Sequence, residues 1–228
     1  KFHVSREKCE KKLFAVPTAI LCSSKVNYES LKIKYPEFKS RLYYEYIGFD
    51  TRLFPRQKPL NDKTIRFVYG GNSGALQNPS GFIRFFERMK GVELHLFGDF
   101  TSVSTDAKNI FTHGKLERLE FIDFLKKRCD VGIVSLTSDY LGACVPAKLF
   151  ELIGLHIPIL GLLPDGDASE IINDNGFGYA VDISSATSEK IFREFSRTKR
   201  AIYCENLKRN SAHYSDANTV NFIREFFE

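Results

Sequence analysis

Short β-type runs alternate regularly with helical patterns from Ile65 onward, and this alternation most constrains how the chain can fold. A strand, a turn, a stretch with apolar residues at helical spacing and a further strand are typical of a βαβ unit. Successive βαβ units place their strands parallel to one another and cover the sheet with helices. The sequence therefore predicts an α/β fold with a Rossmann-like parallel sheet flanked by helices.

The segments before and after Ile65 differ in how much sheet they can form. Before it, one strand–helix–strand unit spans residues 19–47, and a single unit of this kind cannot bury both of its faces alone. We expect residues 1–50 to be the end of a preceding domain, residues 51–64 to be a linker, and residues 65–228 to be the main domain. Its strands are expected at 65–69, 92–97, 109–112, 130–136, 157–160 and 177–181, and its helices at 78–91, 119–125, 146–154, 167–173 and within 187–227.

Composition narrows the class of protein. Hydrophobic residues make up 43% of the 228 residues and charged residues 27%, close to the average of globular chains. No apolar run reaches the roughly 20 residues that span a bilayer, and the first residues lack a secretory signal. The five cysteines are widely spaced and form no CxxC pair, which argues against a disulfide framework and a zinc site. These features indicate a reducing, cytoplasmic compartment.

The net charge of +5 is modest and indicates no nucleic-acid partner. Much of it lies in residues 1–66 and 190–209. Charge clusters of this kind usually form solvated faces. A basic flank also suits the anionic inner face of a membrane, so peripheral membrane association stays open as an alternative.

A glycine-rich loop, Gly70 to Gly74, follows the strand at 65–69 directly. In an open parallel sheet ligands bind outside the carboxyl ends of the strands, where unhindered backbone N–H groups can hold phosphate oxygens. The loop can equally be a tight turn. Its glycines miss the GxGxxG spacing of a dinucleotide site, and no Gly-Lys-Ser/Thr follows as in a Walker loop. Asp99 ends the next strand, where a ribose ligand would lie, so an NAD-binding Rossmann domain remains a lesser alternative.

The strongest signal is the helix that begins at Pro146. Lys148 falls in its first turn, where the helix dipole already favours anions, and Glu151 lies one turn deeper on nearly the same face. A lysine there can offset the charge of a diphosphate, while a carboxylate can accept hydrogen bonds from both hydroxyls of a ribose. The structural alternative is a surface ion pair between the two side chains. The apolar residues around them make a fully solvated face the weaker interpretation.

Several segments, in this order, resemble the motifs of the family 4 retaining glycosyltransferases, which have a GT-B fold. Residues 46–55 (YIGFDTRLFP) are similar to the family's interdomain crossing, and residues 130–135 to its "aDv-x-v-x-PS" strand. Residues 145–161 resemble the "P-S-K-x-x-E-x-x-x-x-G-x-P" helix and strand, and residues 169–178 match "x-E-I-I…G-x-G". Because the matches run in order over nearly the whole chain, the resemblance implies the C-terminal, donor-binding half of such an enzyme.

The resemblance also implies roles for individual residues. Glu151 would bind the ribose hydroxyls, and Lys148 with the backbone at Pro146 and Ala147 would meet the diphosphate. The loop of Gly71, Asn72, Ser73 and Gly74 would also face phosphate, and the backbone at Gly114, Lys115 and Leu116 would clasp the base. Such enzymes transfer a sugar with retention from a UDP- or GDP-sugar to a glycan or lipid-linked acceptor, as in polysaccharide and lipopolysaccharide biosynthesis. They need neither metal nor cofactor, because protein groups neutralise the leaving diphosphate.

This sequence departs from the family pattern in ways that limit those expectations. Residues 72–77 contain no basic residue, and Ala143 stands where the first Glu of the E-x7-E pattern would fall. Asp139 is a candidate for positioning the sugar ring. The catalytic residue is not identified, because the resemblance places it in an N-terminal acceptor domain that this chain lacks. We therefore expect a fragment that binds donor without transferring, the alternative being a non-catalytic nucleotide-binding module.

Overall fold

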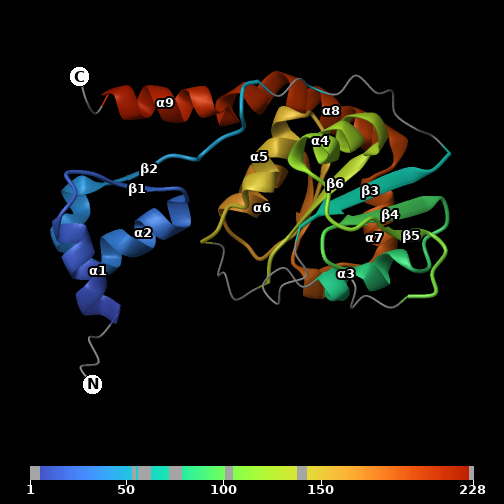
Figure 1. Cartoon of the computed structure of the whole chain (residues 1–228), viewed down its shortest axis with the longest axis horizontal. Helices are drawn as coiled ribbons and strands as arrows, with labels where there is room; N and C mark the ends of the chain where they lie inside the picture. The colour runs from blue at the N-terminus through green and yellow to red at the C-terminus, as the bar shows by residue number, and fades with distance from the viewer. Residues whose placement is uncertain are drawn as a thin grey trace.

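The computed structural model describes residues 6–52, 55, 63–71, 79–100, 105–137 and 143–225. Within these residues a small N-terminal unit stands beside a larger body built on a six-stranded sheet (Figure 1). The last helix leaves the larger body and runs back toward the small unit.

Every strand pair in the larger sheet is parallel, as the alternation of strands and helices predicts. The strand order is β5-β4-β3-β6-β7-β8, so the chain moves outward from the centre to one edge and then returns to build the other half. The strands are β3 (Ile65–Gly70), β4 (Val92–Phe97), β5 (Ile110–Thr112), β6 (Val131–Ser135), β7 (Ile159–Leu162) and β8 (Gly178–Val181).

Helices cover both faces of this sheet, and alternate residues of each strand bury against them. On β3, Val68 packs into the core beneath α4, α5 and α6, whereas Phe67 and Tyr69 pack into the core beneath α3 and α7. Residues of β6 and β7 are all buried, as expected for strands covered on both faces. The helices are α3 (Pro79–Phe86), α4 (Arg118–Arg128), α5 (Ala147–Gly154), α6 (Asp167–Asp174), α7 (Ser188–Glu194) and α8 (Arg197–Asn210).

The N-terminal unit pairs β1 (Ile20–Cys22) with β2 (Leu42–Tyr44) in a parallel two-stranded sheet. Its other elements are α1 (Arg6–Ala15), α2 (Lys25–Lys34) and a 3-10 helix, η1 (Pro36–Arg41). The unit touches the larger body where the N–H of Val26 donates to the carboxylate of Asp167 at 3.1 Å. Asp167 is buried at the first turn of α6, so this contact fixes the start of α2 against the larger body.

The chain crosses between the two parts twice, and the crossings are hydrogen-bonded to each other. Phe49 donates its N–H to the carbonyl of Tyr214 and accepts one from the N–H of Asp216, both at 2.8 Å. Helix α9 (Asp216–Glu225) then continues toward the N-terminal unit, and Thr219 Oγ1 donates to the carbonyl of Tyr46 at 2.6 Å. The ring of Phe49 also packs on α5, because a Cβ at Gly154 would lie 2.6 Å from it.

The elements predicted for residues 65–228 are confirmed in type and order, although several of their ends differ. In the N-terminal unit, helix α1 was not predicted, since residues 6–15 are mostly charged and show little apolar periodicity. Helix α3 ends at Phe86 rather than at Gly91. Strand β7 begins at Ile159 rather than at Ile157, because the N–H of Ile157 bonds to the carbonyl of Leu152 at 3.0 Å and closes α5. Residues 53–54 and 56–62 of the predicted linker, 51–64, lie outside the described residues.

Candidate functional site

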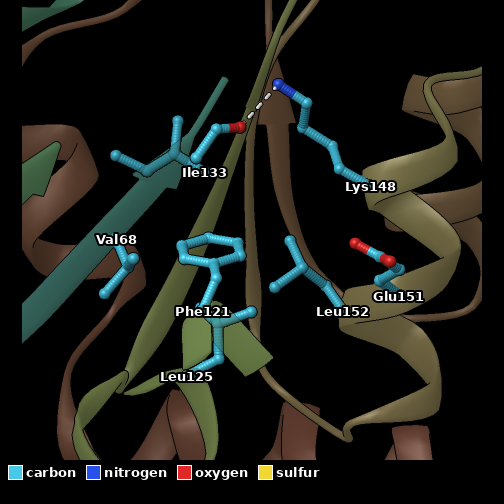
Figure 2. A pocket seen from close by; sticks show the side chains of 8 residues that line it. Val68, Phe121, Leu125, Ile133, Lys148, Glu151 and Leu152 are labelled. Atoms are coloured by element: carbon cyan, nitrogen blue, oxygen red, sulfur yellow. Dashed lines mark hydrogen bonds between the residues drawn. The ribbon is translucent and has the colours of Figure 1, made fainter. Parts of the chain in front are cut away.

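The order of the sheet reverses between β3 and β6, and this reversal places a crevice at their carboxyl ends. A cleft of about 400 Å³ opens there. The loops that follow β3, β4 and β5 line it, together with the first turns of α4. A smaller pocket adjoins the cleft, shares Gly70 and Phe121 with it, and is closed on its other side by Lys148, Glu151 and Leu152 of α5 (Figure 2).

Lys148 is held at the carboxyl end of β3 by neutral groups. Its Nζ donates to the carbonyl of Gly70 at 3.0 Å and lies 4.4 Å from the ring centroid of Tyr69. Among the described residues no carboxylate forms an ion pair with it. Burial lowers the pKa of Lys148 from 10.5 to about 8, and the charge of Glu151 opposes that shift only in part. The ammonium group is therefore a mostly buried cation at the start of a helix without a bonded counter-charge.

Glu151 extends from the next turn of α5 toward the pocket (Figure 2). It does not pair with Lys148, so the predicted alternative of a surface ion pair between these two residues is not the arrangement found. Instead one carboxylate oxygen, Oε1, accepts from both Nε and Nη2 of Arg118, at 3.1 and 2.9 Å. The side chain of Arg118 is 61% exposed and that of Glu151 27%. This ion pair links α4 and α5 across the edge of the crevice.

Arg118 was missed by the sequence analysis. The available signal was its position two residues after the predicted base loop of Gly114, Lys115 and Leu116, where a helix begins. Lys115 and Leu116 line the cleft together with Arg118. Gly114 has a φ of 69°, and its carbonyl accepts the N–H of Gly98 at 2.8 Å, so the base loop is tied to the turn after β4.

The turns after β3 and β4 approach each other closely. The N–H of Gly71 donates to the carbonyl of Phe97 at 2.9 Å. Gly98 has a φ of 135°, and a Cβ there would lie 1.9 Å from the carbonyl oxygen of Gly71. A side chain at Gly98 would therefore push these turns apart. The glycine pattern of residues 70–74 suggested a phosphate loop, but it did not indicate that the turn after β4 also requires a glycine, Gly98.

The predicted site residues converge only in part within the described chain. Gly71, Lys115 and Leu116 line the cleft, and Lys148 and Glu151 line the pocket beside it. Pro146 caps α5 in an extended conformation, and its carbonyl accepts the N–H of Leu149, so Ala147 opens the helix. Asn72, Ser73, Gly74 and Asp139 lie outside the described residues. The ligand roles of all these residues stay predictions.

A histidine pair lies beside Phe97, one of the residues that line the cleft. Nδ1 of His95 and Nε2 of His113 are 2.8 Å apart, and the ring of His113 stacks on Phe97 at 4.4 Å. Nε2 of His95 lies 3.3 Å from Glu93, which also accepts from Arg66 at 2.8 Å. Within the described residues no group of three or more His, Cys, Asp or Glu side chains is placed to hold a metal ion, and no helix is long and apolar enough to cross a membrane.

Comparison with known proteins finds similarity in structure alone. No protein-family model and no curated protein sequence matches the chain. Anabaena HepE in complex with UDP is 14% identical, with a TM-score of 0.76 over 98% of this chain and 69% of HepE. The lipopolysaccharide outer core galactosyltransferase WaaB is 13% identical, with a TM-score of 0.62 over 91% of this chain. Sucrose-phosphate synthase from Thermosynechococcus elongatus is 13% identical, with a TM-score of 0.69 over 97% of this chain.

The chain spans 62% of the length of WaaB and 61% of the sucrose-phosphate synthase. At this level of identity the similarity establishes the fold, while membership of family 4 stays a prediction. The reversed sheet order and the structural matches agree with the expectation drawn from the motifs. The chain has the fold of the C-terminal half of the GT-B glycosyltransferases.

Proposed function

We propose that this chain supplies the donor site of a glycosyltransferase that uses a UDP- or GDP-sugar. The observation that carries the proposal is the placement of Lys148 and Glu151 on one face of α5, each bonded to a different partner, at the reversal point of the sheet. Lys148 is a mostly buried cation with no bonded carboxylate among the described residues, and such a group is stabilised when an anion arrives. A diphosphate beside Lys148 would be attracted both by this charge and by the positive N-terminal end of the helix dipole.

The spacing of these two residues suits a nucleoside diphosphate. One helical turn is about 5.4 Å, a length that a ribose and its 5′-phosphate can bridge. With the diphosphate at Lys148, the ribose hydroxyls would fall at Glu151, and the base would reach the cleft lined by Lys115 and Leu116. Structural neighbours support UDP as the first nucleotide to test, because HepE forms complexes with UDP-glucose and with UDP.

In the proposed reaction the bond between the sugar and the diphosphate breaks, and the diphosphate leaves with its negative charge. Lys148 would stabilise that charge without a metal ion, which lowers the barrier to departure. The sugar would form its new bond to a hydroxyl of the acceptor, a glycan or a lipid-linked glycan. An N-terminal domain would bind that acceptor and supply the group that completes retaining transfer, and residues 1–50 would be the end of that domain. A cytoplasmic location at the inner face of a membrane would suit a lipid-linked acceptor.

Titration calorimetry with UDP and GDP tests this proposal. Wild type is expected to bind one of them in the micromolar range, and Lys148→Ala and Glu151→Ala are each expected to weaken binding by at least about tenfold, the loss of one charge-assisted interaction. Lys208→Ala and Glu205→Ala are matched controls, because these residues form an exposed ion pair at the same i,i+3 spacing on α8. Unchanged affinity in both site variants would contradict the proposal.

The titration together with a transfer assay separates the alternatives. A GT-B half that binds nucleotide but belongs to no transferase would bind UDP or GDP just as the donor site of a transferase would. It would not support sugar transfer when the full-length protein is supplied with a UDP-sugar and membranes. An NAD-binding domain would instead bind NADH more tightly than either nucleoside diphosphate.

A further inference from the structure

The ion pair between Arg118 and Glu151 uses only half of the carboxylate. Both donors of Arg118 reach the same oxygen, Oε1, and occupy its two lone pairs. In bidentate binding of a ribose, each carboxylate oxygen accepts from one hydroxyl. The hydroxyl directed at Oε1 therefore competes with Arg118, and bidentate binding requires Arg118 to give up a hydrogen bond.

Arg118 can leave Glu151 at low cost. Its side chain is 61% exposed, and an exposed ion pair contributes little to stability. Asp50, whose pKa is lowered mainly by Arg52 and slightly by Arg118, does not compete for the guanidinium. Arg52 already donates to both oxygens of Asp50, each at 2.8 Å. No stronger partner among the described residues retains Arg118 where it is.

The charge of a nucleoside diphosphate gives Arg118 a new partner. The diphosphate carries about two negative charges near neutral pH in a nucleotide sugar and about three in free UDP, whereas the described pocket next to Gly70 supplies one cation, Lys148. Arg118 lines the adjoining cleft and already reaches Glu151, one turn of α5 from Lys148. A guanidinium presents two parallel N–H groups, a geometry that matches phosphate oxygens.

We propose that Arg118 is an exchangeable cation that covers Glu151 in the empty site and moves to the diphosphate when a nucleotide binds. The ribose hydroxyls then take its place on Glu151. This inference rests on the proposed function and assigns Arg118 the discrimination between a nucleoside diphosphate and a nucleotide with fewer phosphates. Arg118 is thus a second determinant of donor recognition, contributed by α4, beside the pair on α5.

The test compares Arg118→Gln with wild type in calorimetric titrations with UDP, UMP and uridine. UDP affinity is expected to fall at least about tenfold, because a charge-assisted contact to phosphate is lost. Uridine affinity is expected to stay the same or to rise, because Glu151 is no longer covered. Lys127→Gln is the matched control: it removes one positive charge from an exposed ion pair on the same helix, 2.8 Å from Asp123.

The outcomes separate this inference from the proposed function. If wild type binds neither UDP nor GDP, the proposed function fails and this inference fails with it. If wild type binds UDP and the Arg118→Gln variant binds it equally well or more tightly, the exchange alone is overturned. An equal loss for UDP, UMP and uridine would also overturn it, because Arg118 would then act only by orienting Glu151.

Discussion

The candidate site contains two cations, Lys148 and Arg118, which differ in burial and in the charge of their bonding partners. Lys148 is mostly buried, bonds to a carbonyl group and an aromatic ring, and has a lowered pKa. Arg118 is largely exposed and already bonded to a carboxylate. Burying a charge without a bonded counter-charge opposes folding, whereas an exposed ion pair is nearly neutral for stability.

The difference indicates what each residue contributes. A residue whose burial lowers the free energy of unfolding is expected at a binding site, because a bound ligand of opposite charge can offset that destabilisation. A residue held by a weak, exposed contact is suited to movement. Lys148 is thus the fixed part of the proposed anion site, and Arg118 is the movable part. Substituting Lys148 and Arg118 separately therefore tests whether the two residues have these different roles.

Replacing Lys148 by methionine is expected to have the largest effect, with opposite signs for binding and stability. UDP affinity should fall by about 100-fold, since a mostly buried charge partner of the diphosphate is lost. The free energy of unfolding should rise by up to about 3 kcal/mol, from a pKa lowered from 10.5 to about 8 at about 1.4 kcal/mol per pH unit. Calorimetry and urea unfolding measure the two effects. A variant that loses both binding and stability would show that Lys148 is structural.

The affinity for UDP is expected to depend on pH through Lys148 alone. In the free protein Lys148 is charged below pH 8, and only the charged form attracts the diphosphate. Affinity should therefore fall about tenfold between pH 7 and pH 9. Arg118 stays charged throughout this range.

Stability provides the check on that assignment. Because the folded-state pKa of Lys148 is lowered, its charge destabilises the fold below pH 8, and this penalty is relieved as the pH rises from 8 to 10.5. Lys148→Met should remove both trends. If the pH dependence of UDP affinity persists in that variant, another group is responsible.

The sheet and its order of elements were predictable from sequence, because buried strands such as Val131–Ser135 read as continuous apolar runs. The end of α5 at Gly154 was also predictable, but the reason for this glycine was not. The left-handed position that follows the helix, where glycine is usual, is taken by His156 with a φ of 53°. Gly154 is required instead because Phe49 approaches it closely, from a crossing segment over 100 positions earlier in the chain.

The candidate site likewise has one part that was predictable from sequence and one part that was not. Lys148 and Glu151 were predictable because one helix carries both, and the helix period fixes their relation. Arg118 lies 33 residues from Glu151 on another helix, and only the packed sheet brings the two together. Gly98 similarly depends on a contact with the turn that follows a neighbouring strand. Contacts made across the sheet are not encoded in local periodicity.

Replacing Arg118 by glutamine is expected to leave stability nearly unchanged. The ion pair with Glu151 is largely exposed, so the free energy of unfolding should change by less than about 1 kcal/mol. Lys127→Gln, from the exposed pair on the same helix, should behave alike in urea unfolding. A loss well above that of Lys127→Gln would mean that the link between α4 and α5 supports the fold, and the contrast with Lys148 would disappear.

The smallest effect is expected at the pair of His95 and His113. Burial is the largest influence on the pKa of His95 and lowers it below 6.5, with Arg66 and Arg128 acting in the same direction and Glu93 opposing them. Protons therefore bind the unfolded chain more readily, so the free energy of unfolding should decrease as the pH falls below 6.5. His95→Gln should flatten this decrease relative to wild type in urea unfolding between pH 5 and pH 7.5.

The same substitution is expected to change UDP affinity little between pH 7 and pH 8. The lowered pKa values of His95 and His113 leave both rings uncharged in that pH range, so neither ring attracts the diphosphate. A large loss of UDP affinity in His95→Gln would show instead that the base end of the cleft, and not only the contrast between Lys148 and Arg118, governs donor binding.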